Sequence, residues 1–398
     1  MSAVEPWHRA VADLVARSHR VPPDALPTAV TAAVRELGVA ITIYVVDVEQ
    51  ESLRPLPEPG RPLPDPLPIE ASLPGRAYTE VRARAGQDGR LWVPVVNGTA
   101  RLGLLEVRLP DGADPDDPAL RDGCRLIAGL IGHLVTSKIS YGDGLQRVRR
   151  SEPVAVSAEL LWQLLPPLTF ALDTVAISAI LEPCYEVGGD AFDYALDGGR
   201  LALAVLDGVG HGLPATLTTA VALAALRAAR RTGGGLMDQV VAVEAALRSQ
   251  WRDGRFVTAV LAEVEVDTGR VRYVNCGHPA PVLLRRGRAV RALTGGRRPP
   301  LGLNLPGGEP GEARLEPEDR LLLYTDGVTE ARDAAGEMFG LPRLADLAER
   351  HIGSELPAPE TLRRLSRAVA AYRGTASRDD ATMVLVEWSG AAAARVEP

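Results

Sequence analysis

The sequence predicts an α+β protein of more than one domain, and three observations carry this prediction. Its 398 residues are expected to form two or three domains. The composition, 46% hydrophobic and 24% charged, is typical of a globular protein with real cores. Short apolar runs typical of strands alternate with helix-length amphipathic segments across short turns. Such an order favours antiparallel sheets covered by helices.

Residues 1–142 are expected to form the first domain. The pattern predicts helices over 4–16 and 28–37, separated by a breaker at 21–24. The β-branched run 39–48 predicts a strand, and the runs 90–96 and 101–109 predict a hairpin around Asn97-Gly98. The Pro-rich segment 55–68 is expected to lack regular structure.

A heptad-like apolar stripe follows, and residues 143–166 are interpreted as a helical linker. The stripe includes Leu120, Cys124, Ile127, Ile131 and Leu134. Two interpretations are open: a seam between two helices, which would give a homodimer, or a helix packed on its own sheet. A second helix over 158–165 ends at Pro166-Pro167.

Residues 167–390 are expected to form a second α+β domain. Strands are predicted over 175–181, 201–206, 258–266, 270–275, 282–284, 321–324 and 382–388. Helices are predicted over 216–231, 237–251, 343–350 and 360–372. The tail, 391–398, is expected to be disordered.

Acidic residues stand at the ends of several of these apolar runs. Asp207 and Asp326 each end a run and precede a glycine, Asp190 ends the turn Glu186 to Gly189, and Asp379-Asp380 precede the last strand. Any one of them is ordinary turn chemistry. Together they can converge at one sheet edge, where their mutual repulsion requires a hard cation. Oxygen-only ligands select Mg²⁺ or Mn²⁺ over zinc.

The segments that carry these acids resemble a known family. CYEVGGDAFDY, LDGVGHG, YTDGVTEAR and RDDATMVLV, together with YVNCGHPAPVLL and GEMFG, are similar in type and order to motifs of the metal-dependent protein serine/threonine phosphatases (PPM type) of the bacterial SpoIIE and RsbU branch. The resemblance covers the last 230 or so residues. It implies a helix–sheet–sheet–helix sandwich for the second domain.

The resemblance also implies a site and a reaction. Asp207 would bridge two Mn²⁺ or Mg²⁺ ions, the Gly208 carbonyl would complete the second, and Asp326 and Asp379 would hold the first. Asp190 would contribute directly or through a water. Two ions about 4 Å apart share a hydroxide that attacks the phosphorus. The implied substrate is a phosphoserine or phosphothreonine, typically on an anti-anti-sigma (STAS) protein in a sigma-factor signalling pathway.

Neighbouring polar residues have less specific signals. His211 either protonates the leaving oxygen or ties its loop, and we favour the tie. His278, beside a proline, is interpreted as structural. Asp193 and Asp380 are expected to orient ligands or waters, and Glu330 to be a carboxylate at a helix start.

The first domain resembles, at the level of pattern only, the small-molecule-sensing GAF domain, with LPGRA at 73–77 and GLLEV at 103–107 in the expected places. This implies a small-molecule or protein effector. An α+β packing or dimerisation domain without a ligand is equally open.

Charge and cysteine usage exclude other classes. The net charge of −7 and the absence of a basic block argue against a nucleic-acid partner. Cys124, Cys184 and Cys276 have no disulfide or zinc spacing. Without a leader pattern or an apolar run long enough for a bilayer, we expect a cytoplasmic protein with no membrane contact.

Two rival functions remain open. The GGDAF segment, Gly188 to Phe192, resembles the GGDEF signature of diguanylate cyclases, but Ala191 stands where glutamate is required. The other rival is a catalytically inactive binding module that keeps the acids for structure.

Overall fold

The computed structural model describes residues 5–182, 185–186, 188–285, 288–353, 356–373 and 380–390. The chain divides into two compact units between Pro153 and Val154. Unit 1 ends and unit 2 begins inside the segment interpreted as the linker, between helices α5 (Gly144–Arg149) and α6 (Val156–Leu164).

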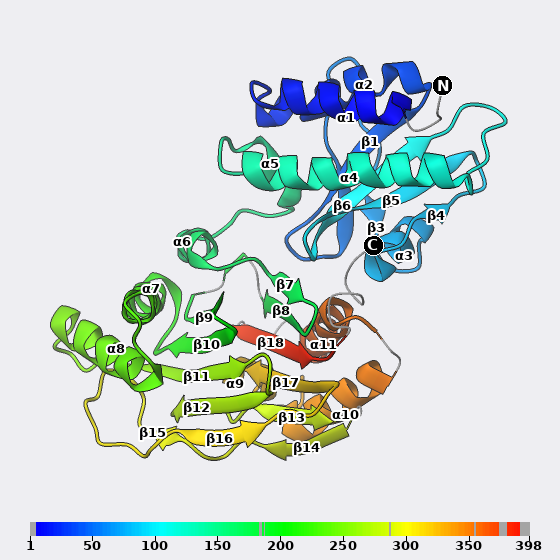
Figure 1. Ribbon diagram of the computed structural model, residues 1–398. Coiled ribbons are helices and arrows are strands. Elements are labelled where there is room, and N and C mark those ends of the chain that lie inside the picture. Colours follow the sequence, from blue (N-terminus) through cyan, green and yellow to red (C-terminus); the bar gives the residue numbers. More distant parts are fainter. Residues whose placement is uncertain are drawn as a thin grey trace. The chain divides into compact units, whose positions relative to one another are not determined.

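Unit 1 is a six-stranded antiparallel sheet with helices around it (Figure 1). The strands lie in the order β3-β2-β1-β6-β5-β4. They are β1 (Ala40–Val46), β2 (Ser52–Pro55), β3 (Leu67–Pro68), β4 (Arg84–Ala85), β5 (Arg90–Asn97) and β6 (Ala100–Arg108). The helices are α1 (Glu5–Ser18), α2 (Leu26–Ala33), α3 (Leu73–Glu80), α4 (Pro118–Lys138) and α5, with 3₁₀ turns η1 (Pro23–Ala25) and η2 (Arg35–Leu37).

The heptad-like stripe of α4 is used inside unit 1. Cys124, Ile127 and Ile131 are completely buried, in one cluster with side chains of α1, α2, β1 and β5. The structure therefore shows the second of the two interpretations, a helix packed on its own sheet. Lys138, the polar member of the pattern, is also buried, and its ammonium donates to the backbone carbonyls of Ser18 (2.8 Å) and Val21 (2.5 Å).

Two predicted elements of unit 1 are corrected, and β2, β4 and α3 were not among the predicted elements. The predicted helix 28–37 breaks at Val34, where α2 ends and η2 begins. The Pro-rich segment is not wholly irregular, because Leu67 pairs with Leu53 at the sheet edge, a position that tolerates proline. Under α3 the sheet carries a packed cluster that includes Tyr44, Tyr78 and Trp92.

Unit 2 is built of two six-stranded sheets with helices outside (Figure 1). One sheet has the order β15-β12-β11-β10-β9, with β16 also paired to β12, and the other has the order β14-β13-β17-β18-β8-β7. The first comprises β9 (Asp190–Asp197), β10 (Arg200–Gly208), β11 (Val257–Glu265), β12 (Arg270–Cys276), β15 (Arg297–Arg298) and β16 (Gly311–Arg314). The second comprises β7 (Thr169–Leu172), β8 (Val175–Glu182), β13 (Val282–Arg285), β14 (Arg288–Ala292), β17 (Asp319–Tyr324) and β18 (Ala381–Trp388).

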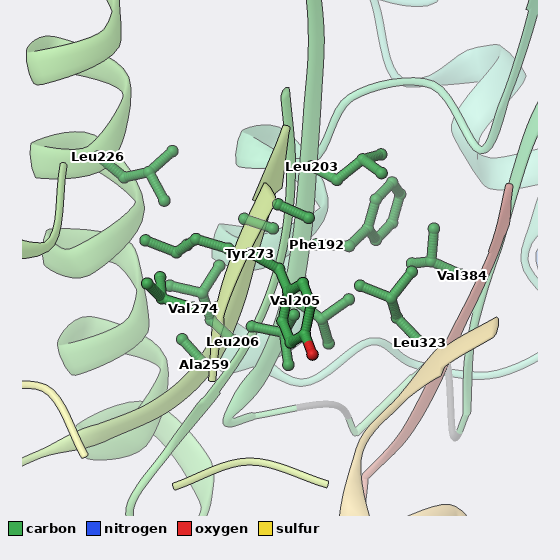
Figure 2. Packing of buried hydrophobic residues seen from close by; sticks show 14 of the residues in the cluster. Phe192, Leu203, Val205, Leu206, Leu226, Ala259, Tyr273, Val274, Leu323 and Val384 are labelled. Atoms are coloured by element: carbon green, nitrogen blue, oxygen red, sulfur yellow. The ribbon is translucent and has the colours of Figure 1, made fainter. Parts of the chain in front are cut away.

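The inner faces of the two sheets form one apolar core. Phe192, Leu203 and Val205 of the first sheet lie toward Leu323 and Val384 of the second (Figure 2). Full burial of each such side chain stabilises the fold by about 1.5–3 kcal/mol. Alternate residues of the same strands, such as Leu206 and Ala259, turn to the outer face, on the side of Leu226 in α7 (Gly212–Arg231).

Helices cover both outer faces. α7 and α8 (Leu236–Gln250) pack against the first sheet, and α10 (Gly340–Gly353) and α11 (Ala358–Arg373) against the second, with the short α9 (Asp326–Thr329) after β17. The predicted fold class and helix–sheet–sheet–helix sandwich are confirmed. β7, β9, β14, β15 and β16 were not among the predicted strands.

One expectation about apolar segments is corrected. We expected no run long enough for a bilayer, yet α7 is long and apolar enough to cross one by length and composition alone. No charged residue occurs in it before Arg227. Three of its apolar residues, Ala222, Leu223 and Leu226, are buried in the core of unit 2. A core helix of a globular unit can therefore also meet the length and composition criteria for a membrane span.

Candidate metal centre

Two acids lie opposite each other at one edge of the first sheet of unit 2. Asp190 is the first residue of β9 and pairs with Asp207, next to the last residue of β10. Directly paired residues of antiparallel strands point to the same face. That face is the inner one, because Phe192 and Val205 lie two residues further along the same strands. Asp190 is 2% exposed.

The turn that precedes Asp190 is held from both sides. One carboxylate oxygen of Asp380 accepts hydrogen bonds from the backbone N–H groups of Gly188 and Gly189, each at 2.7 Å. On the other side, the hydroxyls of Thr216 and Thr219 in α7 donate to the carbonyls of the same two glycines, the second at 2.6 Å. The position of Asp190 is therefore fixed by β18 and α7 together.

Two close backbone approaches require glycine. A Cβ at Gly189 would lie 2.8 Å from the Gly208 carbonyl oxygen, and Gly189 in turn accepts a hydrogen bond from the Gly208 N–H at 3.0 Å. A Cβ at Gly327 would lie 1.7 Å from the backbone oxygen of Asp380. Both glycines follow or precede an acid, so the backbones that carry the acids approach each other more closely than any side chain would allow.

The second sheet reaches the same edge through Thr325 and Asp326. The Thr325 hydroxyl donates to the Asp190 carboxylate at 2.6 Å and accepts from the Thr382 N–H at 2.9 Å. Asp326 follows directly and begins α9. The guanidinium of Arg373 donates to the Gly327 carbonyl at 2.8 Å and so holds the first turn of α9. Thr325 thus connects Asp190 of the first sheet to the end of β17, the strand that Asp326 follows.

Asp190 has the unfavourable electrostatics expected of a cation ligand without its cation. Its pKa is raised well above the usual value, first by burial and then by the negative charges of Asp207 and Asp380, while hydrogen bonds from Thr325 and Thr382 act in the opposite direction. A divalent cation between these carboxylates would remove the repulsion. The donors are all oxygen, which fits Mg²⁺ or Mn²⁺.

The structure brings together most of the residues expected at the site. Asp190, Asp207, Gly208 and Asp326 lie at one edge of the sandwich, while Asp379 lies outside the described residues. Within the described part of the chain, no group of three or more His, Cys, Asp or Glu side chains is close enough to hold an ion. The described acids therefore do not by themselves complete a site.

Asp193 does not act as expected. It is buried on the outer face of β9, where its carboxylate pairs with Arg227 at 2.7 Å and Arg230 at 2.8 Å of α7. It lies three residues from Asp190, so alternation along the strand turns it away from the acid edge. Asp380, in contrast, orients the Asp190 turn, as expected of it.

Glu330 and the histidines also have defined places. Glu330 follows the last turn of α9, because the helix begins at Asp326, so it is not a helix-start carboxylate. His211 is exposed at the N-cap of α7, and among the described residues its side chain makes no capping hydrogen bond, so a tie of its loop stays a prediction. His278 is buried, with Nδ1 2.7 Å from the Thr258 hydroxyl oxygen, consistent with a structural role.

Four threonines and one arginine around the acids were not predicted from the sequence. Thr216, Thr219, Thr325, Thr382 and Arg373 contact the acid-bearing turns. One signal was available for two of them, since Thr325 adjoins Asp326 and Thr382 lies two residues after Asp380. Thr216, Thr219 and Arg373 come from distant helices and had none.

Comparison with known proteins agrees with this geometry. Residues 197–389 match the family model of stage II sporulation protein E (SpoIIE). The chain is 30% identical over 195 residues to the phosphoserine phosphatase RsbP of Bacillus subtilis, a match covering 46% of this chain and 48% of RsbP. It is 23% identical over 245 residues to the phosphoserine phosphatase RsbU of the same organism, covering 61% and 72% of the two chains. The chain thus spans about half the length of RsbP.

A solved structure supports the fold. The PP2C domain of SiaA from Pseudomonas aeruginosa superposes with a TM-score of 0.50 and 23% identity, covering 58% of this chain and 93% of that domain. The sandwich of unit 2, its acid edge and the sequence matches agree with one another. Unit 2 thus has the fold of a PP2C domain, its residues 197–389 match the SpoIIE family model, and its sequence is similar to those of RsbU and RsbP.

Proposed function

We propose that the chain is a metal-dependent protein serine/threonine phosphatase. The observation that carries the proposal is the buried contact between Asp190, which faces Asp207, and Thr325, which precedes Asp326. It joins acids from both sheets at one edge of a SpoIIE-family domain. The relatives named phosphoserine phosphatase support the reaction class.

The ions would be two Mn²⁺ or Mg²⁺. Asp207 and the Gly208 carbonyl, Asp326 and Asp379 would hold them, with Asp190 bound directly or through a water. When bound, such ions supply an activated water at neutral pH and neutralise charge on the phosphoryl oxygens. The raised pKa of Asp190 supports a cation here, because an ion would stabilise its charged form.

The chain's own residues place the acids and offer no cysteine nucleophile in the described region. Asp380, Thr216 and Thr219 fix the Asp190 turn. Cys124 and Cys276 are completely buried, and burial raises the pKa of each thiol to about 12. A thiol in that state is neither a reactive thiolate nor accessible to a phosphoprotein.

The substrate we propose is a phosphoserine or phosphothreonine on a STAS-type anti-anti-sigma protein, in a sigma-factor or stress pathway in the bacterial cytoplasm. The RsbP and RsbU relatives are named phosphoserine phosphatases, which supports a phosphorylated serine as the target. For residues 1–142 we propose a GAF-like sensor of a small-molecule or protein effector. A homodimer through the linker helices would have to use surfaces other than the buried stripe of α4.

The test is hydrolysis of p-nitrophenyl phosphate by the full chain with Mn²⁺, Mg²⁺ or EDTA. Turnover should need the metal, and Asp207→Asn and Asp326→Asn should each abolish it while the protein stays folded by circular dichroism. Turnover in EDTA, or in both variants, would refute the metal mechanism. A folded parental chain without metal-dependent turnover would favour the inactive binding module.

The identity of the substrate can be approached with the same variants. Asp207→Asn, used as a trap, should retain a phosphoprotein from lysate, and phosphosite mapping of that protein identifies the residue attacked. A cyclase assay tests the remaining rival. Ala191, which replaces its glutamate, is completely buried and turned away from the acid edge, so we expect no cyclic dinucleotide.

A further inference from the structure

A buried histidine lies near the acid edge and has no part in the proposed reaction. The His278 side chain belongs to a residue only 7% exposed, and its Nδ1 lies 2.7 Å from the Thr258 hydroxyl oxygen. Its backbone N–H donates to the Asn275 side-chain oxygen at 2.8 Å, which fixes the turn after β12. Nε2 is buried without a hydrogen-bond partner of good geometry in the described structure.

The partner of this histidine stands beside a proposed metal ligand. Thr258 of β11 pairs directly with Asp207 of β10, and Asp207 pairs on its other side with Asp190. The three side chains therefore form one row across the inner face of the first sheet. The His278 ring extends that row by one position.

The opposite side of the ring faces the second sheet. The backbone carbonyl of Tyr324, two residues before Asp326, acts on the His278 ring by favouring its proton. A carbonyl oxygen only accepts hydrogen bonds, so we assign the hydrogen of the ring to Nε2, and Nδ1 then accepts from the Thr258 hydroxyl. The ring thus lies between the strand that pairs with Asp207 and the strand that delivers Asp326.

The ring is a neutral spacer rather than an acid. Burial lowers the pKa of His278 to about 3. A neutral imidazole has one donor and one acceptor, and the contact between Nδ1 and the Thr258 hydroxyl uses one of them. Further from the acid edge, apolar side chains such as Val205 and Leu323 pack the interface between the sheets.

We propose that Thr258 and His278 are a positioning pair that sets the separation of the Asp207 and Asp326 carboxylates, and thereby the binding of the first metal ion, which Asp326 would hold and Asp207 would bridge. This inference rests on the proposed function. Paired ions in such sites lie about 3.5–4 Å apart, so a shift of one sheet against the other by a fraction of that distance disrupts one ion's ligands.

The experiment uses the full chain with Thr258→Val, which keeps the side-chain shape and removes the hydroxyl. Thr258→Ser is the matched control, because it keeps the hydroxyl and removes a methyl group. His278→Phe is a second variant that keeps a ring and removes the acceptor. Mn²⁺ binding is measured by titration calorimetry, the spin coupling of bound Mn²⁺ pairs by electron paramagnetic resonance, and metal-free melting by circular dichroism.

Thr258→Val and His278→Phe should weaken one of two Mn²⁺ sites at least tenfold and reduce the coupled-pair signal, while Thr258→Ser stays near the parental values. Parental affinity and coupling in both variants would overturn the inference. So would a lower metal-free melting temperature with an unchanged coupled signal, since that marks a purely structural pair. Failure of the proposed function itself looks different, because the parental chain would then bind no Mn²⁺.

Discussion

Asp380 accepts hydrogen bonds from the Gly188-Gly189 turn, and a substitution at this position can distinguish two roles for it. In one role Asp380 orders the turn, and in the other it binds a metal ion itself. In Asp380→Ala both N–H groups lose an acceptor that lies 2.7 Å from each. Hydrogen bonds to a charged group contribute about 1.5–3 kcal/mol each. Asp380 is half-buried, so water replaces part of that, and we expect about 2–3 kcal/mol in total.

This loss should appear mainly as weaker metal binding. The turn carries Asp190 and contacts Gly208, so a loosened turn must be ordered again by the ions. At about 1.4 kcal/mol per tenfold change, 2–3 kcal/mol corresponds to roughly 30- to 150-fold more Mn²⁺ for half-maximal hydrolysis of p-nitrophenyl phosphate. Turnover at saturating Mn²⁺ should fall much less.

Asp380→Asn is the matched control. Its amide oxygen can accept from both glycines without the charge, so its Mn²⁺ requirement should lie between those of the parent and Asp380→Ala. If Asp380→Ala keeps the parental Mn²⁺ requirement, the turn does not depend on Asp380 and the reasoning fails. If both variants lose all turnover at any Mn²⁺ concentration, Asp380 is itself a ligand.

Three further predictions concern stability and reactivity. In Asp193→Ala, two arginines of α7 lose their shared carboxylate, although their side chains are only 19% and 18% exposed. We expect a loss of about 2–3 kcal/mol in the free energy of unfolding, which lowers the calorimetric transition temperature of unit 2 by about 5–10 °C. An unchanged transition temperature would contradict the pairing. The pKa of Asp190 is raised in the folded state, so protonation of this group stabilises the metal-free chain fully below the usual aspartate pKa. That contribution to the free energy of unfolding is lost as the pH rises through the raised pKa. Melting curves of Asp190→Asn should therefore depend less on pH than those of the parent, and an equal pH dependence would contradict this. Cys124 and Cys276, whose thiol pKa is about 12, should resist iodoacetamide at pH 8 in the folded chain and react in urea, as mapped by mass spectrometry; rapid labelling of either when folded would disprove their burial.

The sequence predicted the strands of unit 2 best where both faces of a strand are apolar. β10 and β17 are such strands, and the acids at their ends could be recognised as one set. β9 was missed because its first four residues, Asp190 to Asp193, present one acid to each face and so break the alternation. The outward acid depends on Arg227 and Arg230, more than thirty residues away, and no local pattern predicts that partnership.

The surroundings of the acids were less accessible from sequence than the acids themselves. Thr216 and Thr219 lie in a helix whose apolar composition gives no reason to select two threonines as hydrogen-bond donors to a distant turn. Glu330 was assigned to a helix start because α9, only four residues long, is too short to give a periodic signal. These positions follow from tertiary packing, so they appear only once the two sheets and α7 are assembled.

The apolar core determines where the acidic side chains lie at the edge of the sandwich. Two residues from each of four core side chains, the next side chain on the same inner face is polar. The pairs are Phe192 and Asp190, Val205 and Asp207, Leu323 and Thr325, and Val384 and Thr382. The polar edge is therefore the continuation of the inner face, two residues beyond the last apolar layer. A slip of one residue of β9 along β10 would turn Asp190 toward α7 and bury it against apolar side chains. The apolar layer thus fixes the strand register, and the register places the acids on the only face where both sheets can reach them.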